Sequence, residues 1–322
     1  MLNVKKILII RLSALGDILL TTPVIRSIKN KYPNAEIDFL LKKDYFDAIK
    51  YNPNINNILL FGGANPLTHY DIIIDLQNNR VSRSIVSKYK PSSYSTKVYR
   101  FSKPQLKKFM LVNFKINLYK EILQIPERYT ASIPDLMLDD KGLDLFLGDY
   151  GYMELEKGEY IGFAPGSRHF TKRYPIKYFS ELGNLFAEMG FKILIFGGVS
   201  DQIICRELAY KIPGSINLCN DNQLLLTSRY MNECKFVITN DSGLMHVASA
   251  LRVPVVALFG SSVKEFGFAP YKTKNLLLEN NSLSCRPCSH YGREECPKKH
   301  FNCMMKLIPS LVYKKTIEFM EI

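Results

Sequence analysis

Two short stretches far apart in the chain carry residue types that could act on a ligand. The first runs from Arg11 to Asp17 and the second from Asn240 to His246. Each follows an apolar run typical of a strand and opens a segment typical of a helix, so its polar groups are expected between a strand end and a helix start. Open α/β sheets bind ligands at that edge, and helix amino ends favour phosphate. One such stretch in each half predicts two similar lobes that share a cleft.

The carboxylate of Asp17 lies where the first predicted strand gives way to the first predicted helix. A carboxylate that faces a cleft can accept the proton of a hydroxyl group. The same side chain can instead cap the helix or interact with the helix dipole. The position of Asp17 alone leaves both interpretations open.

Four turns in the second half end predicted strands in glycine or other small residues. Glycine lets a backbone approach a ligand closely, and amides that open a helix favour phosphate oxygens. None of the turns fits the P-loop or the Rossmann glycine pattern. Their repetition at successive strand ends nevertheless predicts a nucleotide pocket in the second lobe. The turns are Gly166-Ser167, Gly197-Gly198, Asp241-Ser242-Gly243 and Gly260-Ser261-Ser262.

Three polar side chains in or near these turns are candidates for contact with a ligand. Lys172 follows the Gly166 turn and could neutralise a departing diphosphate without a metal, or could simply face solvent. His246 lies one turn into its helix and could bond a phosphate or a sugar hydroxyl, or be a partly buried histidine bonded to backbone. Asp241 is more strongly indicated as functional, because a buried carboxylate at a strand end needs partners.

Positive charge is concentrated in the region from Arg80 to Lys120. The whole chain has a net charge of +13, and this region contributes eleven Lys or Arg residues, interleaved with aromatic residues, and no Asp or Glu. Such a surface suits an anionic partner, either a phosphorylated lipid at a membrane or a nucleic acid. A merely solvated basic face is the plainer interpretation. Because no nucleic-acid-binding motif accompanies the region, we expect a phosphorylated or membrane-bound partner and no nucleic acid.

Four of the seven cysteines are grouped in the pattern Cys285-x2-Cys288-x7-Cys296-x6-Cys303. The pattern is similar to a four-thiolate zinc arrangement, although the second pair is wider than the usual spacing. A reduced, cysteine-rich loop packed on the second lobe is the alternative. An odd cysteine count without an export signal argues against a disulfide framework. In either case we expect a structural role for this segment and no catalytic metal.

Alternating strand and helix signals organise both halves of the 322-residue chain and predict an α/β fold with parallel sheets. We predict one Rossmann-like domain at residues 1–150, a second at 151–306, and a helix at 307–322 that packs back across the lobes. No run approaches the roughly 18 apolar residues that suggest a membrane span. The apolar stretch before Leu12 is short and interrupted by Arg11, so we interpret it as a buried strand and expect a cytoplasmic protein.

Taken together, these motifs resemble those of glycosyltransferase family 9, the heptosyltransferases of lipopolysaccharide core assembly. The resemblance implies a GT-B fold, in which two Rossmann-like lobes bind the donor mainly on the second and the acceptor mainly on the first. It also implies an inverting transfer that requires no metal or other cofactor besides an ADP-sugar co-substrate. The matching pieces are Leu8–Pro23, Asp71–Gln77, Ala164–Ser167 followed by Lys172, Phe196–Gly198, Thr239–His246 and Val255–Gly260.

The resemblance also assigns roles to individual residues. Asp17 matches the proposed general base, which takes the proton of the acceptor hydroxyl, and Lys172 matches a lysine that contacts the donor diphosphate. The region from Lys88 to Ile125 matches no family motif, and acceptor choice is expected to depend on it. The donor-binding residues implied are Gly166, Ser167, Lys172, Gly197, Gly198, Asp241, Ser242, Gly243 and His246. The acceptor-binding candidates are Ser13 and Gly16, which match the first-lobe turn, together with Arg80 and Arg83 of the basic region.

The expected activity is transfer of a heptose or related sugar from an ADP-sugar to a phosphorylated glycolipid, the inner core or lipid A of lipopolysaccharide. We expect the acceptor at the cytoplasmic membrane face, with the enzyme peripheral to the inner membrane. Alternatives are a nucleotide-sugar 2-epimerase of the same architecture, a GT-B transferase with another donor, and a non-catalytic nucleotide-sugar or nucleic-acid binding protein. The sugar, the nucleotide and the core position stay open at this point.

Overall fold

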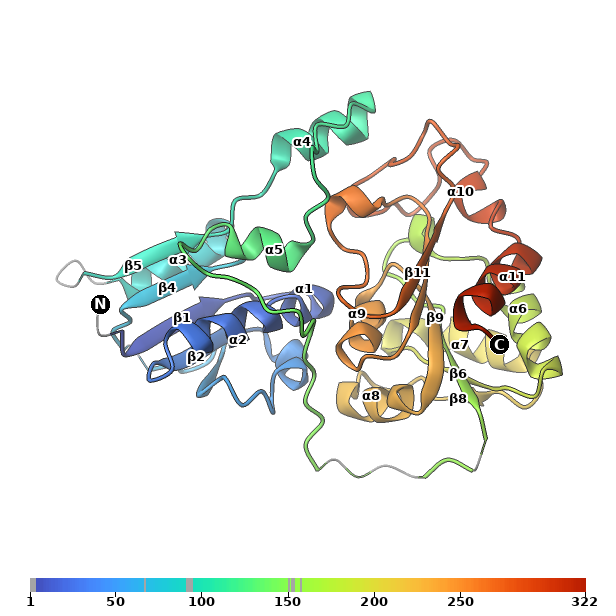
Figure 1. Ribbon diagram of the computed structural model, residues 1–322, viewed down its shortest axis with the longest axis horizontal. Helices are drawn as coiled ribbons and strands as arrows, with labels where there is room; N and C mark the ends of the chain where they lie inside the picture. The colour runs from blue at the N-terminus through green and yellow to red at the C-terminus, as the bar shows by residue number, and fades with distance from the viewer. Residues whose placement is uncertain (1–3, 67, 91–94, 150, 152–153, 157) are drawn as a thin grey trace. The chain divides into compact units, whose positions relative to one another are not determined.

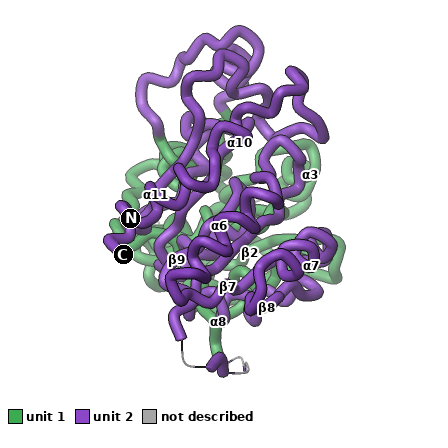
Figure 2. Tube along the Cα trace, turned by 90° about the vertical axis from the view of Figure 1, so that its right-hand side faces the viewer, with its two compact units in different colours: residues 1–103, 123–148 green, residues 104–122, 149–322 purple. Residues whose placement is uncertain are grey.

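The computed structural model describes residues 4–66, 68–90, 95–149, 151, 154–156 and 158–322. The chain divides into two compact units, drawn in different colours in Figure 2. Unit 1 comprises Met1–Lys103 and Leu123–Gly148, and unit 2 comprises Pro104–Ile122 and Asp149–Ile322. The last crossing between units, after Gly148, is close to the predicted domain boundary at residue 150. The assignment of Pro104–Ile122 to unit 2 was not predicted.

Unit 1 is built around a five-stranded parallel sheet in the order β3-β2-β1-β4-β5 (Figure 1). Its central strands are continuous apolar runs, which is typical of parallel strands covered on both faces. The strands are β1 (Lys6–Ile10), β2 (Glu36–Leu41), β3 (Asn57–Leu60), β4 (Ile72–Asp75) and β5 (Lys97–Arg100). The helices are α1 (Leu15–Leu19), α2 (Thr22–Lys31), the 3₁₀ turn η1 (Lys43–Ala48), α3 (Arg80–Tyr89) and α5 (Ile125–Thr130).

Unit 2 contains a six-stranded parallel sheet in the order β11-β10-β9-β6-β7-β8. In Figure 1, α8 and α9 lie on one side of this sheet and α6, α7 and α11 on the other. The strands are β6 (Tyr160–Ala164), β7 (Lys192–Ile195), β8 (Ile216–Asn217), β9 (Cys234–Asn240), β10 (Val255–Phe259) and β11 (Asn275–Glu279). The α-helices are α4 (Gln105–Phe109), α6 (Ile176–Glu188), α7 (Gln202–Lys211), α8 (Leu224–Asn232), α9 (Gly243–Ala250), α10 (Asn302–Met305) and α11 (Pro309–Met320). The shorter turns are the π-helical η2 (Met110–Phe114) and the 3₁₀ turns η3 (Phe170–Lys172), η4 (Val199–Asp201) and η5 (Lys264–Phe266).

The predicted α/β class with two parallel sheets is confirmed, but the first predicted helix, Asp17–Lys31, is divided in two. The division falls between α1 and α2, just before Pro23 in the first turn of α2. A proline inside a continuous helix would lack its N–H donor and clash with the carbonyl four residues back. The hydroxyls of Thr21 and Thr22 donate to the carbonyls of Ile18 and Leu19, at 2.6 and 2.7 Å, and satisfy them.

The last helix, α11, packs on α6 and β11, so its contacts here lie within unit 2. Val312 of α11 is buried in the same apolar cluster as Phe179 and Phe186 of α6. This cluster holds α6 against the sheet and so fixes the end of the loop that precedes α6.

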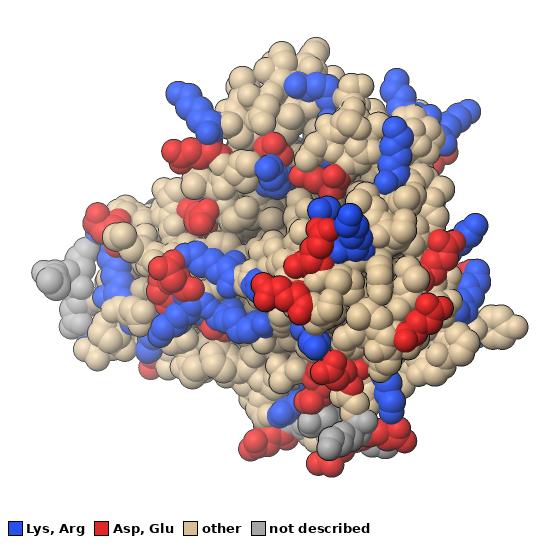
Figure 3. Space-filling view, turned by 45° about the vertical axis from the view of Figure 1, so that its right-hand side comes forward, with Lys and Arg blue, Asp and Glu red and all other residues tan. Residues whose placement is uncertain are grey.

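Surface charge is mixed on the face drawn in Figure 3. Lys and Arg side chains are interspersed there with Asp and Glu. A stretch that lacks acidic residues, such as the one between Arg80 and Lys120, is therefore a local feature and not the general character of this face.

Candidate active site

Asp17 of unit 1 is held by a buried arginine at the carboxyl end of β1. Nη2 of Arg11 lies 2.6 Å from Oδ1 of Asp17. The same guanidinium donates from Nε to the carbonyl of Ser13, at 2.9 Å, and from Nη1 to the carbonyl of Leu76, at 2.8 Å. Arg11 therefore ties the turn after β1 to the end of β4 and fixes the carboxylate in that frame.

The carboxylate of Asp17 is held but not enclosed. Its side chain is 22% exposed, and Oδ2 accepts only a long hydrogen bond from the amide of Ala14, at 3.3 Å. Burial by itself lowers the pKa of Arg11, but the nearby Tyr129 and Asp17 raise it overall, so the guanidinium stays charged. A carboxylate with one oxygen fixed by a permanent cation and the other near solvent is suited to accept a proton from a bound hydroxyl.

Three further polar groups surround this pair, and none of them was predicted as a site residue from the sequence. Asp75, at the end of β4, is buried and accepts from the Ser82 hydroxyl at 2.9 Å. Tyr129, in α5, is fully buried, and burial raises its pKa, with Asp17 adding to the effect. Burial also lowers the pKa of Lys103, and the charge of Arg11 lowers it further. Only Asp75 follows a strand in the manner of Asp17 and could have been found by the same rule.

The predicted acceptor residues are distributed around this turn and on α3. Ser13 and Gly16 belong to the turn and to α1 itself, as expected. Arg83 is exposed in the first turns of α3, and its Nε donates to Oδ1 of Asn78 at 3.1 Å. Its charge also lowers the pKa of Lys103, which places Arg83 within electrostatic reach of the Asp17 pair. Arg80 is exposed at the start of α3, and no described contact ties it to the pair.

Asp241 of unit 2 is the centre of a buried polar cluster at the carboxyl edge of the second sheet. Nζ of Lys172 lies 2.6 Å from its Oδ2, and the hydroxyl of Ser262 donates to the same oxygen at 2.5 Å. Burial alone raises the pKa of Asp241, but Lys172, Ser262 and the nearby His246 lower it overall, so the carboxylate is ionised. The cluster joins the ends of β9 and β10 to the turn that follows β6.

The turn that carries Lys172 is positioned by hydrogen bonds from two neighbouring strand ends. The side chain of Asn240 donates to the carbonyl of Pro165, at 2.7 Å, and accepts from the amide of Tyr174, at 2.9 Å. The amide of Ser261 donates to the carbonyl of Thr171, at 3.2 Å. A Cβ atom at Gly260 would lie 2.6 Å from that same carbonyl, so only glycine permits this approach.

The predicted glycines after β6 and β7 make room for protein atoms. A Cβ atom at Gly166 would overlap the carboxylate of Asp201, and one at Gly197 would lie 2.8 Å from the Cβ of Asp201. A Cβ atom at Gly198 would overlap the side-chain oxygen of Asn222. The turns after β6, β7 and β8 therefore pack closely on one another. Their glycines are explained by this packing, whatever ligand lies above them.

The start of α9 supplies the remaining predicted donor residues. Ser242 is its N-cap, and its buried hydroxyl has no hydrogen-bond partner among the described residues. Gly243 opens the helix, and His246 is buried one turn later beside Asp241. Ser167 reaches the same place, because its hydroxyl donates to the carbonyl of Asp241 at 3.4 Å. Backbone amides at a helix start together with a lysine form a site suited to phosphate oxygens.

The cysteine-rich segment braces the Lys172 turn from outside. Thr171 and Arg293 exchange two hydrogen bonds: the Thr171 amide donates to the Arg293 carbonyl at 3.1 Å, and the Arg293 amide donates to the Thr171 hydroxyl at 2.8 Å. Burial raises the pKa of Cys288, and that of Cys303 to about 11, so these thiols are protonated at neutral pH. Within the described part of the chain, no three His, Cys, Asp or Glu side chains are arranged to hold a metal ion.

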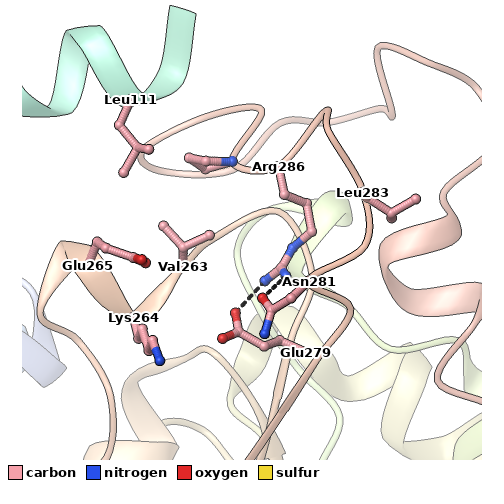
Figure 4. A pocket seen from close by; sticks show the side chains of 9 residues that line it. Leu111, Val263, Lys264, Glu265, Glu279, Asn281, Leu283 and Arg286 are labelled. Atoms are coloured by element: carbon pink, nitrogen blue, oxygen red, sulfur yellow. Dashed lines mark hydrogen bonds and ion pairs between the residues drawn. The ribbon is translucent and has the colours of Figure 1, made fainter. Parts of the chain in front are cut away.

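Arg286, between two of these cysteines, organises the loop after β10 and was not singled out from the sequence. Its guanidinium donates to the carbonyls of Gly260 and Ser262, at 2.6 and 2.7 Å, and pairs with Glu279 at 2.7 Å. Figure 4 shows this buried pair at one side of a cavity of about 320 Å³, which Leu111 and Val263 close from the other side. Arg286 was overlooked because it lies in a cysteine-rich stretch whose cysteines suggested a zinc site. It fixes Ser262, and Ser262 in turn supports the Asp241 cluster.

Two parallel-sheet units with polar turns at their carboxyl edges give the chain the two-lobed α/β architecture of the GT-B fold. A sequence model described as glycosyltransferase family 9 (heptosyltransferase) matches residues 67–299, and the chain belongs to this family. The predicted resemblance is thereby confirmed, and membership of a transferase family decides against the epimerase and the non-catalytic binding protein.

Individual relatives agree with this assignment. Lipooligosaccharide heptosyltransferase 2 of Campylobacter jejuni serotype O:2 is 27% identical over 314 residues, which cover 94% of this chain and 94% of the relative. The solved structure of the glycosyl transferase family 9 from Veillonella parvula has a TM-score of 0.75 at 22% identity and covers 98% of this chain and 97% of its own. The structure of E. coli ADP-heptose lps heptosyltransferase II has a TM-score of 0.70 at 21% identity and covers 98% of both chains. Among the described residues, no helix is long and apolar enough to cross a membrane.

Proposed function

We propose that this enzyme transfers a heptose, or a closely related sugar, from an ADP-sugar to a phosphorylated inner-core acceptor of lipopolysaccharide. The observation that carries this proposal is the Asp17 carboxylate at the end of β1, fixed by Arg11 through one oxygen and partly open at the other. Support for the donor and acceptor classes comes from the family and from relatives named as ADP-heptose and lipopolysaccharide heptosyltransferases. We place the reaction at the cytoplasmic face of the inner membrane, where such an acceptor is presented.

The reaction is a single displacement with inversion. The acceptor oxygen forms a bond to the anomeric carbon while the bond from that carbon to the phosphate oxygen breaks, and the electron pair leaves with ADP. Asp17 receives the acceptor proton. Arg11 holds the carboxylate in place during the attack. No metal or other cofactor takes part in these steps.

Negative charge that grows on the departing diphosphate is stabilised by unit 2. The ammonium of Lys172 retains N–H donors beyond the one directed at Asp241, and the start of α9 adds backbone amides. Preorganised donors of this kind stabilise a transition state without reorganising during the reaction. Asp241 keeps Lys172 in position, and its own ionised state depends on that lysine. In unit 1, Lys103 interacts electrostatically with Asp17 and with Arg83, and these two cations can attract a phosphorylated acceptor.

The donor is tested by calorimetry of the full-length protein with ADP, UDP and GDP, followed by mass spectrometry of the product formed from ADP-heptose and an inner-core acceptor. We expect selective ADP binding and an acceptor mass increased by one heptose. Preference for UDP or GDP, or turnover only with another ADP-sugar, would replace the donor and keep the fold. Absence of any nucleotide binding would contradict the proposal.

A further inference from the structure

The segment Pro104–Ile122 forms an apolar surface that the catalytic account leaves unused. It contains α4, η2 and the extended residues that follow, and it belongs to unit 2. Leu106 and Phe114 are 68% and 60% exposed, values that are high for side chains of this size and kind. The large apolar side chains exposed along the segment are Leu106, Phe109, Phe114, Ile116, Leu118 and Ile122.

The opposite side of the segment is fixed to unit 2. Leu111 is buried in a small apolar cluster with Val263 and Phe266. The ammonium of Lys115 donates to the carbonyl of Pro287 at 2.7 Å. The segment is therefore anchored on the loop after β10. Its exposed apolar side chains lie on the part of the segment that does not pack on unit 2.

The charge of the segment indicates what this surface contacts. Besides the anchoring Lys115 it carries Lys107, Lys108 and Lys120 against the single acid Glu121, unlike the mixed face of Figure 3. Aliphatic and aromatic side chains flanked by lysines are typical of segments that lie in a membrane interface, where apolar groups enter the acyl boundary and lysines meet anionic headgroups.

Other occupants fit less well. A second copy of this chain bound symmetrically would bring lysines of one segment against the same lysines of the other, which is electrostatically unfavourable. A nucleic acid would satisfy the lysines but offers no apolar environment for Leu106 or Ile116. An anionic lipid surface satisfies both kinds of side chain.

We infer that Pro104–Ile122 docks unit 2 on an anionic lipid surface. This inference rests on the proposed function, because an acceptor presented at a membrane is what brings the enzyme to lipid. The anchoring cluster begins at Val263, directly after Ser262, whose hydroxyl holds Asp241. The docked segment thus packs on a residue that directly follows the loop supporting the proposed donor site.

The test is flotation of full-length protein with vesicles that contain no acceptor, made of phosphatidylcholine alone or with about 30% phosphatidylglycerol, an anionic lipid. The test variant is Leu106→Ser/Phe114→Ser. The matched control is Ile203→Ser/Tyr210→Ser, which removes two side chains of α7 that are even more exposed, at 81% and 89%. ADP affinity is measured by calorimetry in parallel, as a control for intact folding of unit 2.

We expect wild type and the control to bind anionic vesicles, weakened by salt, and the test variant to lose on the order of ten-fold in binding. ADP affinity is expected to stay within about two-fold for all three proteins. Failure of wild type to float, equal flotation of the test variant, or equal loss in the control would overturn the inference. So would light scattering that shows self-association relieved by the test variant. Because the vesicles lack acceptor, failure of the proposed transfer leaves the flotation result readable.

Discussion

Asp17 in unit 1 and Asp241 in unit 2 occupy equivalent places and differ in what surrounds them. Asp17 lies in the first turn of α1, after β1, and Asp241 lies between β9 and α9; each is 2.6 Å from a cationic nitrogen. The Asp17 side chain is 22% exposed and the Asp241 side chain 9%. Similar local geometry therefore yields a partly exposed carboxylate in unit 1 and a buried, ionised carboxylate in unit 2.

The two cations, Arg11 and Lys172, also differ in how firmly they are held. Arg11 directs its other N–H groups to the carbonyls of Ser13 and Leu76, so its planar fork is locked in place. Lys172 is a point charge on a flexible stem and can share its donors between Asp241 and an arriving phosphate. A rigid partner suits a residue that must keep its orientation, and an adaptable partner suits one that meets a ligand.

The largest expected effect comes from removing the cation of the buried pair. Lys172→Met leaves Asp241 buried and uncompensated, which costs about 3–5 kcal/mol of unfolding free energy, and ADP affinity falls with it. Urea unfolding and calorimetry measure the two losses. The double variant Lys172→Met/Asp241→Asn is expected to recover much of the stability and none of the affinity. Equal stability of Lys172→Met and wild type would show that the pair is not coupled.

A second, smaller effect is expected at the locked arginine. Arg11→Lys keeps the charge but loses the fork that ties Asp17 to the ends of β1 and β4, so kcat for transfer is expected to fall about 10- to 100-fold. ADP affinity is expected to be unchanged, because Arg11 belongs to unit 1. Steady-state kinetics separate kcat from KM, with the exposed Arg206→Lys as control. A pure rise in KM would assign Arg11 to acceptor binding instead.

A third prediction concerns the close backbone approach at Gly260 in unit 2. Gly260→Ala forces a Cβ atom against the Thr171 carbonyl and displaces the Lys172 turn. We expect a stability loss of about 1–3 kcal/mol and weaker ADP binding. Gly151→Ala is the control, because no atom lies within 4 Å of the added Cβ there. Equal behaviour of the two variants would mean that the turn tolerates the shift.

The smallest effect is a pH dependence of stability carried by Asp241. Its pKa is lower in the folded chain than in the unfolded chain, despite burial, because of Lys172, Ser262 and His246. Such a group stabilises the fold fully above its unfolded pKa, about 4, and that contribution is lost as the pH falls toward the folded pKa. Unfolding free energy measured between about pH 6 and pH 3 should therefore fall more steeply for wild type than for Asp241→Asn. Parallel curves would remove Asp241 from the acid response.

Local patterns in the sequence predicted much of this arrangement. The apolar runs that end at Arg11 and Asn240, each followed by a helix signal, located both carboxylates at strand ends, because strand and helix periods are written in neighbouring residues. Even the division between α1 and α2 had a visible cause in Pro23. The position of Asp241 at a strand end predicted a buried carboxylate, but several of the partners around the two carboxylates were not predictable, since they come from segments elsewhere in the chain.

The residues that were missed are those supplied from a distance. Arg286 reaches the carbonyls after β10 from the cysteine-rich segment, and Tyr129 reaches Arg11 from α5. The segment Pro104–Ile122 leaves the first half of the chain to pack on Val263 and Phe266. No periodicity within any of these segments encodes its partner, because the contact exists only once the two sheets have formed.

The most direct measurement is made on Asp17→Asn, with ADP affinity by calorimetry and heptose transfer from ADP-heptose on the same preparation. If unit 1 supplies the base and unit 2 holds the donor, ADP affinity stays within about two-fold while transfer falls by about 100-fold or more. Unchanged transfer, or affinity and transfer lost together, would contradict this division of labour between the two carboxylates.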